Sequence, residues 1–245
     1  MTSQAAALGV AGVIIGVLVG ATGIGGVLLV PFLVHGLGYP VQSAVAVALW
    51  SYLWSGLLAI ALYWRRGSIA VRPALWLCTG AIPGAFLGAA ALAVVPGTIV
   101  QALIGGVLLV GGIQTLRPPR SPTERTPPGP GLLVGLGLLT GFASALLGAF
   151  LLVPLLVALG EPVLLAVGLG QVIQVPISAV ATVANLRAGR IDLVSGSILA
   201  AALAVGIAGG TPLAHGVSQR TLRLLVAVAM LVAAAVMVGR LARVF

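Results

Sequence analysis

Eight apolar segments follow one another along the chain, and each is long enough to cross a lipid bilayer as a helix, which takes about 20 apolar residues. They run approximately over residues 5–37, 41–64, 71–95, 97–116, 131–159, 162–186, 193–215 and 221–241. Only 6% of the 245 residues are charged, whereas soluble domains carry about 25%, so an ordinary soluble fold is excluded. The sequence therefore predicts an all-α polytopic membrane protein with about eight transmembrane helices.

The chain also divides into two similar halves. Between the fourth and fifth segments lies a charged, proline-rich stretch, RPPRSPTERTPPGP, which is typical of a linker outside the membrane. The sequence GGVLLVP at 25–31 matches GAFLLVP at 148–154, and RRGSI at 65–69 matches RAGRI at 187–191. Two matches at nearly one offset predict an internal duplication, with a first transmembrane repeat at 1–116, a cytoplasmic linker at 117–130 and a second repeat at 131–245.

The first apolar segment of each half is too long for a single crossing and contains a break. Residues 5–37 would form a helix of about 50 Å, whereas the hydrocarbon core is about 30 Å thick. The break reads GATGIGG at 20–26 and GFASALLG at 141–148, and Pro31 and Pro154 follow the two breaks. Because glycine is unfavourable inside a helix, we expect discontinuous helices or re-entrant hairpins at both places.

The arginines, which are all twelve of the basic residues, predict the orientation of the helices. If each half crosses the membrane four times, ten arginines share one side with both termini and the linker, and only Arg220 and Arg223 lie on the other. Because cytoplasmic loops are rich in Arg and Lys, this count favours parallel repeats with cytoplasmic termini. If each broken segment instead doubles back, the repeats are inverted and the split becomes eight to four.

Carboxylates are scarce, and none lies in the middle of an apolar segment. Glu124 is in the linker, Glu161 lies between two segments and Asp192 stands at the start of another. A proton or sodium relay usually uses an embedded carboxylate, so a cation pump or channel is disfavoured. With a single cysteine, arginines scattered between apolar runs and no nucleophile–base pair, we expect no metal, no cofactor, no nucleic-acid partner and no enzymatic activity.

Polar residues recur at helical spacing in the sixth segment, at Gln171, Gln174, Ser178, Thr182 and Asn185. This spacing places them on one face of a helix, and amide and hydroxyl groups are costly to expose to lipid, so the face lies against protein or water. Pro176, beside this face, removes a backbone hydrogen bond and predicts a helix break. The face indicates a transport pathway, with helix–helix packing as the alternative.

The corresponding segment of the first half is polar at the matching positions as well, because an offset of 123 aligns Ser51 with Gln174 and Ser55 with Ser178. A half-helix that begins inside the membrane presents unpaired N–H groups, which bind an anion without a charged side chain. The alternative for the glycines of the first break is close helix packing. The candidate substrate-binding residues are Gly23, Gly25, Gly26, Ser51, Ser55, Ser144, Gly148, Gln171, Gln174 and Ser178.

Three motifs, GATGIGGVLLVPFL, YWRRGSI and NLRAGRID, together resemble those of the TauE/SafE sulfite exporter family, also called the TSUP permeases, and the resemblance covers about residues 9–239. It implies a duplicated permease that exports small anions such as sulfite, sulfoacetate or other sulfonates across the bacterial inner membrane. The family's glycine-rich element corresponds here to Gly23, Gly25, Gly26 and Pro31, and to Gly148 and Pro154 in the second half. The second half lacks the family's usual run of glycines and reads ALLGA at 145–149.

Two other functions remain open from the residues alone. The same polar face could line an anion channel, or the chain could be a non-transporting membrane subunit that anchors a complex. The expected partners are a small anionic substrate and the lipid bilayer. The sequence leaves open whether the chain acts as a monomer or as a homodimer.

Overall fold

The computed structural model describes residues 2–22, 25–65, 67, 69–116, 128–148, 152–159, 161, 163–216 and 219–241. Throughout these residues the regular structure is helical, without strands. In chain order the elements are α1 (Thr2–Thr22), η1 (Gly25–Leu28), α2 (Leu29–Pro31), η2 (Phe32–Gly36), α3 (Val41–Arg65), α4 (Val71–Val94), α5 (Gly97–Leu116), α6 (Pro130–Leu147), α7 (Leu152–Ala158), α8 (Val163–Arg187), α9 (Leu193–Gly216) and α10 (Gln219–Leu241).

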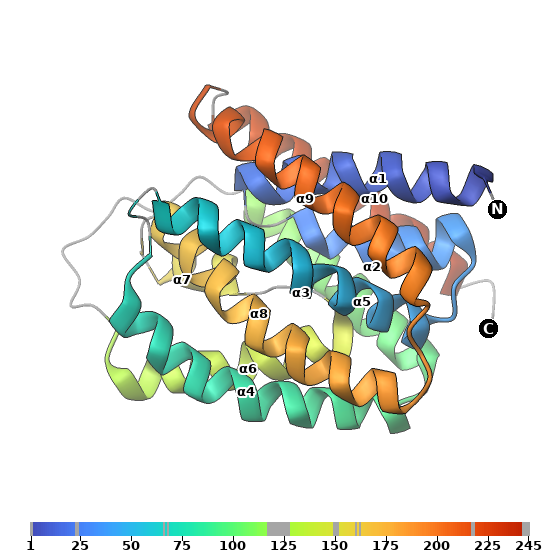
Figure 1. The fold of residues 1–245 in the computed structure, drawn as a ribbon, viewed down its shortest axis with the longest axis horizontal. Helices are drawn as coiled ribbons and strands as arrows, with labels where there is room; N and C mark the ends of the chain where they lie inside the picture. Colours follow the sequence, from blue (N-terminus) through green and yellow to red (C-terminus); the bar gives the residue numbers. More distant parts are fainter. Residues whose placement is uncertain are drawn as a thin grey trace.

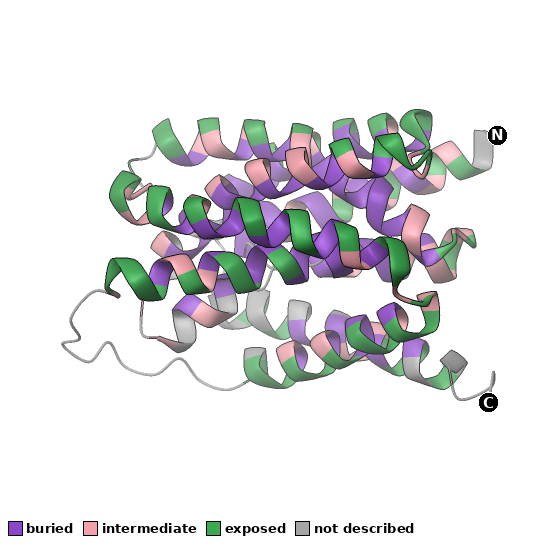
Figure 2. Cartoon of the chain, turned by 90° about the horizontal axis from the view of Figure 1, so that it is seen from below, coloured by how far each residue is buried: buried purple, intermediate pink, exposed green. Residues whose placement is uncertain are grey.

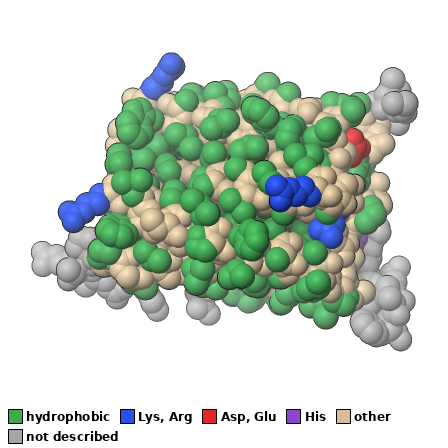
Figure 3. Space-filling model, turned by 60° about the horizontal axis from the view of Figure 1, so that its bottom comes forward, with side chains coloured by type: hydrophobic (Ala, Val, Ile, Leu, Met, Phe, Trp, Pro, Cys, Tyr) green, Lys and Arg blue, Asp and Glu red, His purple; other side chains and the backbone are tan. Residues whose placement is uncertain are grey.

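The helices form a bundle, and most of them have the length and composition of membrane spans. Within the described residues seven helices are long and apolar enough to span a membrane, namely α1, α3, α4, α5, α6, α8 and α9. α10 is a further helix of 23 residues. Buried residues face the inside of the bundle (Figure 2), and apolar side chains spread over its surface (Figure 3). Because apolar side chains also cover the outside, the predicted all-α polytopic membrane protein is confirmed.

Both predicted helix breaks are present. α1 ends at Thr22, after which the chain passes through a 3-10 turn, one short α-helical turn and a π turn. In the second half α6 ends at Leu147, because Gly148 adopts a left-handed conformation with a φ of 64° that side chains with a Cβ avoid. α7 then begins at Leu152. We refer to residues 25–36 as the first broken segment, and to Gly148 with α7 as the second.

The three prolines differ in what they do to the helices. Pro31 is the last residue of α2, and the helix changes to the π form immediately after it. Pro154 is the third residue of α7, where its missing N–H has no partner inside the helix in any case. Pro176 lies inside α8, which continues without interruption from Val163 to Arg187. The prediction of a helix break at Pro176 is therefore wrong, because a long buried helix tolerates the loss of one hydrogen bond.

Each broken segment doubles back towards the end of the bundle from which its half starts. Gln4, in the first turn of α1, donates a hydrogen bond to the hydroxyl of Tyr39 at 3.2 Å, and Tyr39 lies just before α3. α1 and α3 therefore begin at the same end of the bundle. α6 and α8 likewise begin together, at the opposite end (Figure 1). α1 and α6 each cross the bundle once, so the chain between the two helices of each pair must return across it in the opposite direction.

The two halves are consequently inverted with respect to each other. α1 begins and α10 ends at one end of the bundle, whereas α5 ends and α6 begins at the other (Figure 1). We name these the terminal end and the linker end. The arginine count favoured parallel repeats with the termini and the linker on one side, and that expectation is wrong. The arginine count assumed one crossing for each apolar segment. A broken segment that turns back changes the side on which every later arginine lies.

The contacts between helices follow the same two-fold pattern. If α1, α3, α4 and α5 are exchanged with α6, α8, α9 and α10, every main packing pair maps onto another. α1 packs on α9 as α6 packs on α4, α3 on α9 as α8 on α4, and α3 on α8 and α5 on α10 map onto themselves. This arrangement agrees with an internal duplication, which itself stays a prediction.

Glycines allow α4 to pack closely on α6, and α1 on α9, with the two backbones in contact. A Cβ added to Gly84 of α4 would lie 2.2 Å from the carbonyl oxygen of Leu138 in α6. A Cβ added to Gly210 of α9 would lie 2.3 Å from the carbonyl oxygen of Val17 in α1. Both distances are shorter than van der Waals contact, so these positions require glycine, as expected for membrane helices that pack through small residues.

Candidate transport site at the crossing of α3 and α8

The crossing of α3 and α8 forms the centre of the bundle. The side-chain amide of Gln174 in α8 donates a hydrogen bond to the main-chain carbonyl of Tyr52 in α3, at 3.3 Å. Gly56, one turn further along α3, lets α8 approach closely, because an added Cβ would lie 3.1 Å from Val175. The hydroxyl of Tyr52 in turn donates to the carbonyl of Gly26 in the first broken segment. The crossing thus connects the first break to the polar face of α8.

The register of the two helices differs by one residue from the sequence alignment. α3 and α8 each contain 25 residues, and their ends correspond at an offset of 122. At this offset Gln174 corresponds to Tyr52 and Ser178 to Gly56, instead of to Ser51 and Ser55. The offset of 123 holds for the matching sequences at 25–31 and 148–154. The connection from this motif to α3 is therefore one residue longer than the connection from its counterpart to α8.

The five polar residues of α8, which we name the polar row, lie on one buried face. Gln171, Gln174, Ser178, Thr182 and Asn185 are at most 4% exposed. Outside this face of α8, Val183 is 51% and Leu186 is 43% exposed. The prediction that the polar face lies against protein or water, away from lipid, is confirmed, since all five of its side chains are buried inside the bundle.

Three atoms of the polar row are buried without a hydrogen-bond partner. They are Oε1 of Gln171, Oγ of Ser178 and Oγ1 of Thr182. A buried hydroxyl or amide without a partner costs about 1–3 kcal/mol. Native proteins retain few such groups, and each calls for an explanation such as a bound ligand or water. Three such atoms on one helix face make the polar row the candidate site of the bundle.

The chemistry of the polar row suits an anion with oxygen acceptors. Ser178 and Thr182 each carry a hydroxyl that donates one hydrogen bond, and rotation of the Gln171 amide presents either its oxygen or its NH₂ group. All three groups are neutral, so they bind an anion without holding a permanent countercharge. In the described part of the chain, no group of three His, Cys, Asp or Glu side chains is arranged to hold a metal ion.

Ser51 and Ser55 were expected to bind substrate, but their hydroxyls are already engaged in the helix bundle. Ser51 donates to the carbonyl of Val47 at 2.8 Å and also lies 3.0 Å from the carbonyl oxygen of Gly196 in α9. Ser55 donates to the carbonyl of Ser51 at 2.8 Å. Their contacts are those of helix packing, and a role in binding stays a prediction.

The two glycine-rich breaks come together, and the binding of an anion by N–H groups at the start of η1 and α7 stays a prediction. Gly148 packs against the first broken segment, because an added Cβ would lie 2.7 Å from Val30. The N–H of Gly148 donates to the carbonyl of Ser144, which is buried, at 2.8 Å. Gly25 and Gly26 begin η1, whereas Gly23 lies outside the described residues. The end of α6 is therefore closed by its own glycine cap, since that cap uses the N–H group.

Tyr52 is a site residue that the sequence analysis missed. It lies in the middle of an apolar run, where a phenol hydroxyl is costly unless it finds a partner. Tyr63, eleven residues further along α3, similarly donates to the carbonyl of Gly20 in α1 at 3.1 Å. The sequence could have identified Tyr52 by its place in the middle of a membrane segment. A tyrosine hydroxyl at that depth is expected to donate a hydrogen bond to a main-chain carbonyl of a neighbouring element.

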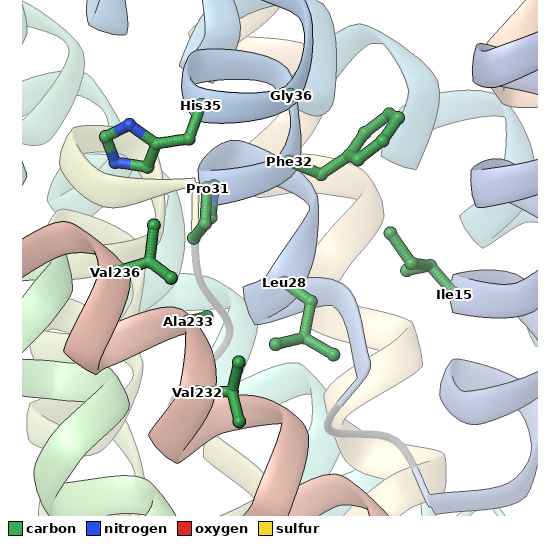
Figure 4. Close-up of a pocket in the computed structure, with 9 residues that line it drawn as sticks. All are labelled: Ile15, Leu28, Pro31, Phe32, His35, Gly36, Val232, Ala233 and Val236. Atoms are coloured by element: carbon green, nitrogen blue, oxygen red, sulfur yellow. The ribbon is translucent and has the colours of Figure 1, made fainter.

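A separate pocket lies beside the first broken segment, between α1 and α10 (Figure 4), with a volume of about 450 Å³. It is lined by Ile15, Leu28, Pro31, Phe32, His35, Gly36, Val232, Ala233 and Val236. Apart from His35 the lining is apolar, so a small anion would lose its hydration there without replacement hydrogen bonds. The polar row does not line this pocket and is the better candidate for an anion.

A hydrogen-bonded cluster holds together the terminal end of the bundle. The hydroxyl of Tyr39 lies 2.8 Å from the hydroxyl of Ser195 and 3.1 Å from the carboxylate of Asp192. Asp192 caps α9, since its carboxylate accepts from the N–H of Ser195 at 3.1 Å and from its hydroxyl at 2.7 Å. The Ser195 hydroxyl is the main reason that the pKa of Asp192 is held below its usual value. Partial burial raises the pKa of Tyr39.

Comparison with known proteins agrees with this architecture. The family model described as Sulfite exporter TauE/SafE matches residues 8–237, from the first turns of α1 to the last turns of α10. No curated protein and no solved structure matches the chain. The match includes both broken segments, the crossing of α3 and α8 and the whole polar row. The chain therefore belongs to the TauE/SafE sulfite exporter family of membrane transporters.

Proposed function

We propose that this protein is a permease for sulfite or for a small organosulfonate such as sulfoacetate, and that the anion binds at the polar row beside the crossing of α3 and α8. The observation that carries the proposal is the set of three buried, unpartnered atoms on Gln171, Ser178 and Thr182. Sulfite and sulfonate oxygens are hydrogen-bond acceptors, so the hydroxyls and a rotated amide can replace part of their hydration shell.

The distribution of carboxylates favours an anion over a cation. Among the described residues Asp192 precedes α9 and Glu161 lies between α7 and α8, so neither is inside a long helix. A cation would meet only neutral dipoles at the polar row, whereas embedded carboxylates normally mark cation pathways. For an anion the same absence removes a source of repulsion.

The inverted halves support alternating access. The binding site lies where α3 of one half crosses α8 of the other, so movement of the halves against each other would open it to one side at a time. Tyr52 belongs to this contact through its carbonyl and also holds the first broken segment through its hydroxyl. Rocking at the crossing would therefore move the break together with the site.

For the orientation we infer that the linker end faces the cytoplasm of a bacterium and that the termini lie outside its inner membrane. Eight arginines belong to the linker end by their place among the helices, namely Arg65, Arg66, Arg72, Arg117, Arg120, Arg125, Arg220 and Arg223. Four belong to the terminal end, namely Arg187, Arg190, Arg240 and Arg243. Cytoplasmic segments carry the excess of arginine. This replaces the expectation of cytoplasmic termini, and export is then movement from the linker end to the terminal end.

The test is uptake of labelled sulfite into proteoliposomes, with sulfoacetate and sulfate as competitors. The double variant Gln171→Leu with Ser178→Ala should reduce saturable uptake by about tenfold or more, because two hydrogen bonds to a charged ligand are lost. Gln114→Leu, which changes an exposed glutamine of α5, is the matched control. Size-exclusion chromatography shows whether each variant is folded.

The other results separate the alternatives. Uptake that does not saturate with concentration would favour an anion channel. Folded wild-type protein that moves none of these anions would exclude them as substrates and favour a non-transporting subunit. Full uptake by the double variant would contradict the binding site and leave the permease function standing. Whether the active unit is a homodimer is answered by the mass of the active species.

A further inference from the structure

We propose that the polar row continues as a one-sided anion path from the centre of the bundle to the terminal end, and that Arg190 is the anion-binding residue at its mouth. This inference rests on the proposed function, since it describes how the same anion reaches water. The new points are that the anion leaves the binding site along the polar row towards the terminal end, and that Arg190 binds it there.

The first step is the reach of the polar row. From Gln174 at the crossing, Ser178, Thr182 and Asn185 follow along α8 towards the terminal end. Eleven residues of α-helix cover about 16 Å, which is about half the thickness of the hydrocarbon core. Each turn of α8 in this half of the bundle therefore presents one buried polar side chain, and Ser178 and Thr182 are without partners.

The second step is the turn that ends α8. Gly189 has a φ of 64°, and the N–H of Arg190 donates to the carbonyl of Asn185 at 3.1 Å, as in a Schellman motif. This turn folds Arg190 back over the end of the polar row. Its guanidinium donates a hydrogen bond to the side-chain oxygen of Asn185 at 3.4 Å. The last residue of the polar row is therefore in contact with a cation.

The third step is the charge of Arg190. Among the described residues, no carboxylate forms an ion pair with its guanidinium, which is half-buried. Asp192, two residues further on, directs its carboxylate to Ser195 and Tyr39 instead. A guanidinium has five N–H donors, and one of them contacts Asn185. The remaining donors can bind an anion that arrives at or leaves the polar row, and arginine binds oxyanions through paired N–H groups.

The fourth step is the contrast with the other half. At the offset of 122, the positions on α3 that correspond to Ser178, Thr182 and Asn185 are Gly56, Ile60 and Tyr63. The hydroxyl of Tyr63 donates to the carbonyl of Gly20. In the described part of α3 no buried side-chain atom lacks a hydrogen-bond partner. On the linker side of Tyr52, the buried hydroxyls of Ser55 and Tyr63 in α3 are already engaged, so the unpartnered hydroxyls of Ser178 and Thr182 favour a path towards the terminal end.

The kinetic test compares two arginines of the same turn. Arg190→Gln should raise the KM for sulfite presented at the terminal end by about tenfold, because a charged hydrogen bond is lost. Arg187→Gln removes one charge from an exposed residue three positions earlier and should leave the KM unchanged. Arg190→Lys keeps the charge and should restore part of the affinity, which a purely structural cap would not require.

The accessibility test uses the single native cysteine. In a Cys78→Ser background, Thr182→Cys should react with a membrane-impermeant thiol reagent added at the terminal end, and sulfate should slow the reaction. Ala59→Cys, at a buried position of α3, is the matched control and should not react from that end. Reaction of Thr182→Cys from the linker end alone would overturn the proposed direction.

The outcomes separate this inference from the proposed function. If wild-type protein transports sulfite but Arg190→Gln behaves like Arg187→Gln, the mouth at Arg190 is wrong and the permease stands. If wild-type protein transports no sulfonate or sulfite, the proposed function fails and this inference fails with it.

Discussion

The side-chain amide of Gln174 binds the main-chain carbonyl of Tyr52 at 3.3 Å, and this bond joins the two halves of the chain at equivalent positions of α8 and α3. Tyr52 also links Gln174 to the first broken segment, because its hydroxyl donates a hydrogen bond to the carbonyl of Gly26. One buried tyrosine therefore ties a break, a crossing and the polar row together. Such a chain of hydrogen bonds gives the centre of the bundle a defined geometry in a region where lipid offers no partners.

Tyr52→Phe should lower the free energy of unfolding by about 1–3 kcal/mol, because the carbonyl of Gly26 loses a hydrogen-bond donor in a buried position. Transport should fall as well, since the first broken segment loses its attachment to the crossing. Tyr63→Phe is the comparison, because its hydroxyl binds Gly20 of α1 and not the broken segment. Denaturation in detergent and uptake in proteoliposomes measure both effects. Unchanged stability and uptake of Tyr52→Phe would show that the bond is dispensable.

Thr182→Val should stabilise the protein by about 1 kcal/mol while reducing transport, because it removes a buried hydroxyl that has no hydrogen-bond partner. Thr140→Val is the control, since Thr140 is equally buried but donates to the carbonyl of Leu136 at 2.6 Å. That substitution removes a satisfied group and should bring no gain. Thermal unfolding of the two variants distinguishes them, and a loss of stability in Thr182→Val would count against a binding role.

Gly84→Ala should force α4 and α6 apart, because the added Cβ would lie 2.2 Å from the carbonyl oxygen of Leu138. Overpacking of this kind costs about 1–3 kcal/mol and sometimes more. Gly135→Ala in α6 meets no atom within 4 Å and should be neutral or gain up to about 1 kcal/mol of helix propensity. Denaturation of both variants gives the difference, and equal stabilities would contradict the close packing.

Cysteines placed at Gln4 and Gly129 should be labelled from opposite sides of the membrane, because α1 begins at the terminal end and Gly129 precedes α6 at the linker end. The Cys78→Ser background supplies a protein without other thiols. Membrane-impermeant maleimide added to intact cells should react with Gln4→Cys, and Gly129→Cys should react only after the membrane is opened. Labelling of both from one side would restore the parallel arrangement of the repeats.

The stability of the terminal end should depend on pH through Asp192. Hydrogen bonds, chiefly from Ser195, hold the pKa of this carboxyl below its usual value of 3.8. The folded pKa is thus the lower one, so the contribution to stability is complete above about pH 4 and is lost as the pH falls through the folded pKa. Asp192→Asn should remove this dependence, with Glu161→Gln as the control for a carboxylate elsewhere. Identical melting profiles of wild type and Asp192→Asn between about pH 2 and pH 5 would contradict the linkage.

Several features follow from the sequence because the bilayer leaves few choices. A backbone in hydrocarbon must satisfy its own hydrogen bonds, so long apolar segments form helices. The 3.6-residue period then places Gln171, Gln174 and Ser178 on one face, and the cost of exposing them to lipid turns that face inward. The breaks are equally local, because Gly148 permits a left-handed φ that ends α6.

Other features required the tertiary structure. The apolar length of residues 5–37 is the same whether the segment runs on or turns back, and only the contact between Gln4 and Tyr39 shows that it returns. The availability of Ser51 likewise depends on the carbonyl of Gly196, 145 residues away. The local sequence determines which polar groups must be kept away from lipid, because the free-energy cost of exposing a polar group to lipid depends on that residue alone. Which partner each group finds is decided by the packing of distant helices, and that choice separates the engaged hydroxyls of α3 from the unpartnered ones of α8.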